Sequence, residues 1–114
     1  MKTLLVTVLI AASLAIAGSP AEAQGKRAFT GVITDSMCPT GDHSRMRMGP
    51  TDAACTIACV EAHGAAYVLH DGKETYTLSD QKTPEKLAGK KVTVTGTLDA
   101  KTKTIQVDSI AAAR

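Results

Sequence analysis

Aromatic side chains are scarce in this chain. Its 114 residues include no tryptophan, one phenylalanine and two tyrosines, and the formal net charge is only +2 at pH 7. Proteins that bind single-stranded nucleic acid combine stacking aromatics with a basic groove. The sequence offers neither feature, so we expect no nucleic acid partner.

Motifs of the common enzyme classes are also missing. The sequence contains no H-E-x-x-H motif, no glycine-rich phosphate loop and no recognisable constellation of serine, histidine and aspartate. The acidic residues are scattered, so no pair of glycosidase carboxylates can be picked out. We therefore expect that the protein is not an enzyme.

Long apolar runs are missing as well, except at the amino terminus. There Lys2 precedes the apolar run Leu4–Ala17, and an A-x-A cleavage site ends at Ala23. This order is typical of a secretory signal peptide at residues 1–23. The apolar run is shorter than the roughly twenty residues that a membrane span needs. We expect residues 24–114 to form a single domain, periplasmic or secreted, with no membrane anchor.

Threonine alternates with aliphatic residues along much of the remaining chain, which is typical of half-buried strands. Asp71–Gly72 favours a tight turn, and a lysine-rich turn near Lys101 separates two further candidate strands. These turns predict two antiparallel hairpins. The predicted strands are residues 28–35, 66–70, 74–79, 91–99 and 104–110.

Capping residues predict two short helices. Thr51 fits the N-cap of a helix over residues 53–62, which ends before Gly64. Residues 83–89 begin with a threonine and a proline and end with a glycine, which predicts about one and a half turns of helix.

Five strands in so small a domain favour an all-β, OB-like, partly closed barrel, because closure removes most exposed strand edges. Gly31 and Gly96 lie inside predicted strands, where glycine marks a bulge or bend. The second helix lies between strands three and four, as in OB-folds, and the first lies in an insertion between strands one and two. An SH3-like barrel or an open meander is the alternative fold.

The metal-binding residue types gather in that insertion, residues 35–64. Three thiols and one imidazole follow the spacing Cys38-x4-His43-x11-Cys55-x3-Cys59. These four side chains are the ligand set of a tetrahedral Cys3His zinc site. The sequence therefore predicts a transition-metal site, most simply structural zinc.

Other residues of the insertion bear on this interpretation. Met46 and Met48 follow His43, and thioethers together with thiolates favour copper(I), so copper is the alternative metal. Asp35 and Ser36 directly follow the first strand. We interpret them as the Asx or Ser turn that starts the insertion.

A disulfide is the alternative to a metal, since exported proteins meet an oxidising environment. A bond from Cys38 to Cys55 or to Cys59 would fix the insertion and suit a metal-free adhesion or carbohydrate-binding domain. One odd thiol would remain. A thiol redox protein is the third interpretation, although C-x3-C departs from the C-x-x-C of thioredoxin-like motifs.

Several motifs run through nearly all of residues 24–114. They are G-x-I-x-D-S-x-C at residues 31–38, then His43, the C-x3-C pair, and A-G-x-x-V-x-V-x-G at residues 88–96. With them the chain resembles a group of small exported bacterial proteins that are similar to OB-fold domains and have no established activity. The resemblance implies the fold, export, and a single unit made of Cys38, His43, Cys55 and Cys59. We expect an exported binding module for an unidentified exported ligand or protein.

Overall fold

The structure, a computed structural model, describes residues 25–113. The predicted signal peptide at residues 1–23 lies outside this range. Within the described part of the chain, no helix is long and apolar enough to cross a lipid bilayer.

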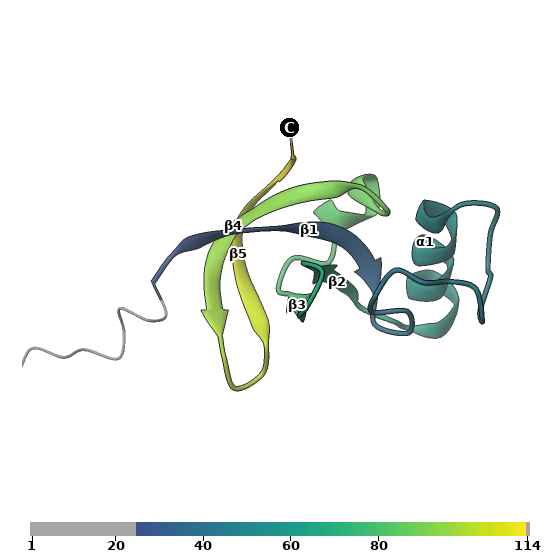
Figure 1. The fold of residues 1–114 in the computed structure, drawn as a ribbon, viewed down its shortest axis with the longest axis horizontal. Helices are drawn as coiled ribbons and strands as arrows, with labels where there is room; N and C mark the ends of the chain where they lie inside the picture. Colours follow the sequence, from purple (N-terminus) through teal and green to yellow (C-terminus); the bar gives the residue numbers. More distant parts are fainter. Residues whose placement is uncertain (1–24, 114) are drawn as a thin grey trace, which may run out of the picture.

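The five strands form one mixed sheet that closes as a ring (Figure 1). The order around the ring is β1-β2-β3-β5-β4, and β1 pairs with β4 to close it. All pairings are antiparallel except that of β3 with β5, which spans two residue pairs and leaves the ring short of a regular barrel. The predicted mostly β, OB-like fold is confirmed. The strands are β1 (Arg27–Asp35), β2 (Tyr67–His70), β3 (Thr75–Leu78), β4 (Lys91–Asp99) and β5 (Thr104–Ala112).

The core lies inside the ring and follows the predicted alternation. In β4 the valines Val92 and Val94 are fully buried, whereas the intervening threonines are half-buried. All three aromatic side chains belong to the core, and Phe29 meets Tyr76 edge to face at 5.5 Å between ring centroids. The core cluster is Phe29, Ile33, Tyr67, Leu69, Tyr76, Leu78, Ala88, Val92, Val94 and Ile105.

Gly96 marks a bend in the sheet, as predicted. The register between β4 and β5 shifts between Thr95 and Gly96. A Cβ at Gly96 would collide with the backbone carbonyl of Gln106 and lie 2.9 Å from Cγ2 of Ile105. The bulge therefore needs a residue without a side chain at this point.

Both predicted helices are present, and one differs in type. Helix α1 (Asp52–His63) has Thr51 as N-cap, whose hydroxyl accepts a hydrogen bond from Ala54 N at 3.1 Å. It ends at Gly64, which has a left-handed backbone with φ of 67°. The second helix, η2 (Thr83–Leu87), is a 3-10 helix between β3 and β4. It is shorter than the predicted 83–89 because Ala88 already leaves the helical region, with a ψ of 134°.

Candidate metal centre

The insertion between β1 and β2 begins and ends at two residues that are hydrogen-bonded to each other. Ser36 N donates to Ala66 O at 2.9 Å, and Ala66 N donates to Ser36 Oγ at 2.9 Å. Between these residues the chain forms a loop and then α1, at the end of the molecule away from the β4–β5 hairpin (Figure 1). The candidate site lies where this loop and α1 meet the end of β1.

Asp35, the last residue of β1, is fully buried. Its Oδ1 accepts hydrogen bonds from Met37 N at 3.0 Å and Cys38 N at 2.9 Å, so the predicted Asx turn is present. The turn uses only one carboxylate oxygen. The other, Oδ2, faces the side chain of His43.

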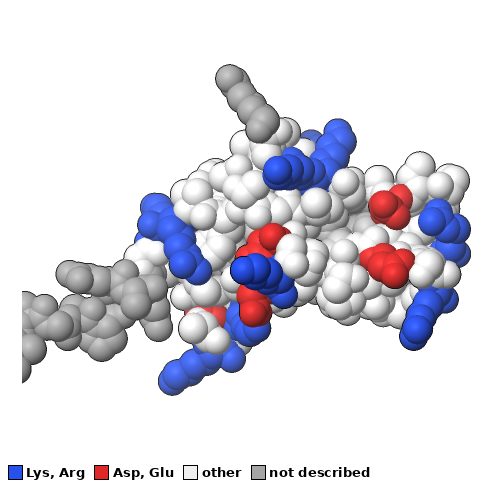
Figure 2. Space-filling model, viewed as in Figure 1, with Lys and Arg blue, Asp and Glu red and all other residues white. Residues whose placement is uncertain are grey.

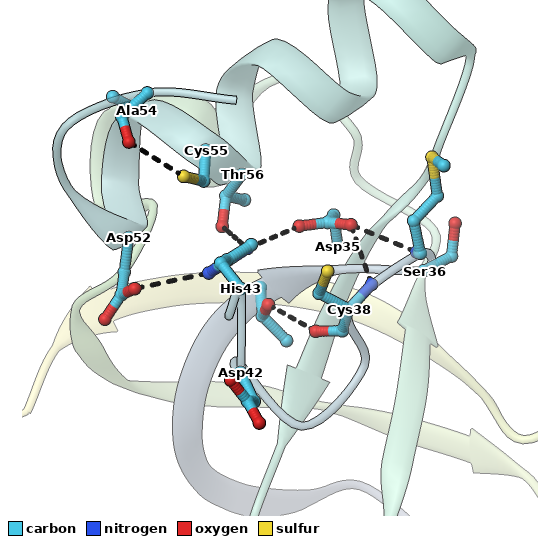
Figure 3. A network of polar contacts seen from close by, with 12 residues as sticks. Asp35, Ser36, Cys38, Asp42, His43, Asp52, Ala54, Cys55 and Thr56 are labelled. Atoms are coloured by element: carbon cyan, nitrogen blue, oxygen red, sulfur yellow. Dashed lines mark hydrogen bonds and ion pairs between the residues drawn. The ribbon is translucent and has the colours of Figure 1, made fainter. Parts of the chain in front are cut away.

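His43 is buried despite its polar sequence neighbours, with 2% of its surface exposed. Its Nε2 lies 3.0 Å from Asp35 Oδ2 and 3.5 Å from Thr56 Oγ1, and its Nδ1 lies 3.2 Å from Asp52 Oδ1 (Figure 3). The two ring nitrogens of His43 therefore face two different aspartates, and the tautomer of the ring decides which nitrogen donates.

The three cysteines are buried and free. Burial and the nearby negative charge of Asp35 raise the pKa of the Cys38 thiol. The same two causes raise the pKa of Cys59, and a hydrogen bond with Asp35 adds to them. Cys55 is oriented differently, because its thiol donates to Gly49 O at 3.2 Å.

One group of side chains in the described residues could hold a metal ion. Asp35, Cys38 and His43 each offer one ligand atom, and these three atoms lie within 4.8 Å of one another. Two of the four predicted ligands, Cys38 and His43, belong to this group. Cys55 and Cys59 do not belong to it.

Asp35 was not predicted as a ligand of the site. A signal was present, because Asp35 belongs to the D-S-x-C run that ends at Cys38. Asp35 was predicted only to form the turn. A carboxylate has two oxygens, however, and the turn needs only one of them, so the other oxygen can also bind a metal.

The remaining histidines and methionines lie elsewhere. His63 is exposed in the last turn of α1, and Nδ1 of His70 lies 3.1 Å from Thr75 Oγ1. Met46 and Met48 are 38% and 39% exposed and do not belong to the buried group. The thioethers on which the copper alternative rests are therefore at the surface.

Comparison with known families finds one match, which lies in the second half of the chain. Residues 59–113 match the DUF5818 model. That family is described as a protein of unknown function. No curated protein and no solved structure matches the chain. The DUF5818 segment begins at Cys59 and includes β2 to β5, so Asp35, Cys38 and His43 all precede it.

Proposed function

We propose that this protein is a small exported binding module whose insertion holds a structural zinc ion. The observation that carries the proposal is the buried group of Asp35, Cys38 and His43, which offers one oxygen, one sulfur and one nitrogen atom within 4.8 Å of one another. Zinc accepts each of these ligand types.

The spacing of the group suits a tetrahedral ion. Zinc bonds of 2.0 to 2.3 Å place two tetrahedral ligands about 3.3 to 3.8 Å apart. His43 Nε2 and Asp35 Oδ2 are 3.0 Å apart, and every pair in the group is within 4.8 Å. Zinc binding thus needs Nε2 of His43 to be free of a hydrogen, and it needs changes of up to about 1.5 Å in the distances between ligand atoms.

The surroundings of the two non-sulfur ligands also suit a metal. Histidine ligands usually donate their other ring N–H to a carboxylate, which fixes the ring and its tautomer. Asp52 stands in that position at Nδ1 of His43. Asp35 is likewise held by two backbone N–H groups on the oxygen that does not face His43.

We propose Cys59 as the fourth ligand in place of Cys55. Its thiol is fully buried beside Asp35, whereas the Cys55 thiol is hydrogen-bonded to Gly49. Four protein ligands leave no open position for a substrate water, which is typical of structural rather than catalytic zinc. This set therefore accords with our proposal that the protein is not an enzyme.

The free thiols bear on the two metal-free alternatives. A disulfide-stapled adhesion or carbohydrate-binding domain needs a Cys38 bond, and all three cysteines are free. A thiol redox protein needs a thiol whose pKa is lowered. The pKa values of Cys38 and Cys59 are instead raised by burial, which disfavours a redox-active thiol.

Export and partners remain proposals that rest on the sequence. We propose that residues 1–23 are removed and that the mature chain is periplasmic or secreted, where it binds an exported ligand or protein. On the face shown in Figure 2, lysine and arginine side chains form separate groups rather than one basic surface. This distribution supports the proposal that nucleic acid is not a partner.

Native and denaturing mass spectrometry of protein purified from the export compartment tests the proposal. We expect a mass that begins near Gln24, one zinc ion per chain under native conditions, and three titratable thiols after chelation. A chain that stays metal-free in the presence of excess zinc would contradict the metal site. A mass that retains residues 1–23 would contradict export.

Replacing Asp52 by alanine is expected to weaken zinc binding by about 10- to 100-fold, because His43 loses the carboxylate that orients its ring. Competition with a chromogenic chelator measures the affinity. Asp42→Ala is the matched control, since Asp42 is also exposed but accepts its hydrogen bond from Ser44 N. Equal losses in the two variants would contradict the role of Asp52.

Zinc is expected to change the pH dependence of the free energy of unfolding. Without metal, the raised pKa values of Cys38 and Cys59 mean that the folded chain holds the thiol protons more tightly than the unfolded chain. This contribution to stability is present below about pH 8.5 and is lost as the pH rises through the folded-state pKa values. When zinc is bound to thiolates, the unfolded chain binds more protons than the folded chain. The free energy of unfolding therefore rises with pH up to about 8.5.

Urea unfolding between pH 7 and 9.5, with chelator or with one equivalent of zinc, checks this prediction. The expected slope with zinc is up to about 1.4 kcal/mol per pH unit for each thiolate ligand. The same pH profile under both conditions would contradict it.

A further inference from the structure

The buried face of α1 is unusual because it carries no fully buried aliphatic side chain. Its buried residues are Cys55, Thr56 and Cys59. Ile57 and Val60 pack against the core of the ring but are only partly buried. The contact of α1 with the ring therefore consists of two buried cysteines, a buried threonine and three partly buried apolar residues, Ala53 among them.

The ring, by contrast, has a core of its own. Every residue of the core cluster lies on a strand except Ala88, which follows η2. The strands β1 and β2 pair directly over Val32–Asp35 and Tyr67–His70. The two hydrogen bonds between Ser36 and Ala66 close the insertion at its base. The strand pairs and the core cluster of the ring therefore include no residue of α1.

The candidate ligands come from both sides of this contact. Asp35 belongs to the end of β1, Cys38 and His43 to the loop, and Cys59 to α1. Asp52 and Thr56 also belong to α1, and they lie 3.2 Å and 3.5 Å from the two ring nitrogens of His43 (Figure 3). The ligands and these two residues can surround one ion only when α1 is docked against the end of β1.

We propose that zinc controls the docking of α1: the ion holds the helix against the ring, and in its absence the loop and helix of residues 40–65 detach as a unit while the ring stays folded. Cys38 and Pro39 stay with the ring, because they are hydrogen-bonded to Thr34 and Thr75. This inference rests on the proposed zinc site and on Cys59 as a ligand from the helix. It goes beyond the site itself, because binding of the ion then decides whether α1 is docked against the end of β1.

Electrostatic interactions are the reason why zinc favours the docked state of α1. Docking without metal buries the carboxylate of Asp35 and the ring of His43, and removing charges from water offsets much of what their pairing gains. Zinc supplies positive charge at the centre of the group and replaces hydrogen bonds by metal bonds. Because a ligand shifts an equilibrium only through its differential affinity, binding to the docked state alone gives the largest shift.

The expected effect follows from linkage. Free zinc at a hundred times its Kd lowers the population of the undocked state by about 100-fold. A detached α1 is only 12 residues long, and isolated helices of that length are marginal in water. Detachment should therefore melt the helix and expose its amides to exchange.

Amide hydrogen exchange of the purified protein, followed by NMR with chelator and with zinc, tests the inference. We expect zinc to slow exchange by up to about 100-fold for the amides of Thr56–His63. Amides of β4, such as those of Val92 and Val94, serve as the internal reference and should change little. Native mass spectrometry of the same samples reports the zinc content.

The outcomes separate the two proposals. Chains without zinc would overturn the proposed site and this inference with it. One zinc per chain with unchanged exchange in α1, or with equal slowing in α1 and β4, would leave the site intact and overturn the switch. Cys55→Ser should keep the response of the wild-type chain, and Cys38→Ser should lose it.

Discussion

Replacing Cys59 by serine is expected to abolish stoichiometric zinc binding, whereas replacing Cys55 by serine leaves it in place. Both cysteines are fully buried and both lie on α1, one helical turn apart. Cys59 lies beside Asp35, and its thiol contributes to the metal group in our proposal. Cys55 instead donates its thiol hydrogen to Gly49 O, a contact that a serine hydroxyl can also make.

The size of this effect follows from the number of ligands. Loss of an outer-shell partner already weakens metal binding by about 10- to 100-fold, and loss of a direct thiolate ligand should exceed that. Native mass spectrometry and chelator competition measure zinc content and affinity. If Cys55→Ser loses zinc and Cys59→Ser keeps it, the Cys3His assignment from the sequence needs Cys55, and the orientation of that thiol toward Gly49 is not its metal-bound state.

The strands and the helix ends were predictable because each depends on residues that are neighbours in the chain. The alternation of valine and threonine over residues 91–99 matches β4, and Thr51 and Gly64 end α1 where their capping chemistry predicted. The type of η2 was not predictable, since a proline, a glycine and a single turn suit a 3-10 and an α-helix equally. Which strands lie next to one another depends on contacts between distant residues, and the OB-like order came from the resemblance and the strand count.

The candidate site was less predictable because its members are far apart in the chain. Spacing alone drew attention to the thiols and His43, yet it could not show which helix cysteine faces the group. The neighbours Asp42, Ser44 and Arg45 are polar, and they give no sign that His43 is buried in the structure. Asp52 also was not recognised, because its place in the first turn of α1 already explained its charge.

Asp35 has two separable roles, and substitutions at this position should distinguish them. One carboxylate oxygen holds the turn through Met37 N and Cys38 N, and the other faces His43. Asp35→Ala removes both roles, so that Nε2 of the buried His43 and the backbone N–H of Met37 lose the carboxylate that faces them. We expect the metal-free variant to lose about 3–5 kcal/mol of unfolding free energy, the cost of breaking a buried pair.

Asp35→Asn should behave differently. Its amide oxygen can still accept from the two backbone N–H groups, and its NH2 can donate to Nε2 of a neutral His43 whose Nδ1–H points to Asp52. We expect the metal-free variant to lose less than about 1.5 kcal/mol, because the hydrogen bonds are retained without their charge. Zinc binding should nevertheless be lost, since an amide replaces the carboxylate ligand.

Asp80 provides the matched control for both substitutions. Its Oδ1 also accepts two backbone hydrogen bonds, from Lys82 N at 2.9 Å and Thr83 N at 3.0 Å, but no histidine faces it. Asp80→Asn and Asp80→Ala should therefore leave zinc binding unchanged. Urea unfolding with chelator and zinc titration of all four variants measure the two roles. Full zinc binding by Asp35→Asn would remove Asp35 from the ligand set, and wild-type stability of Asp35→Ala would show that the buried pair with His43 does not stabilise the fold.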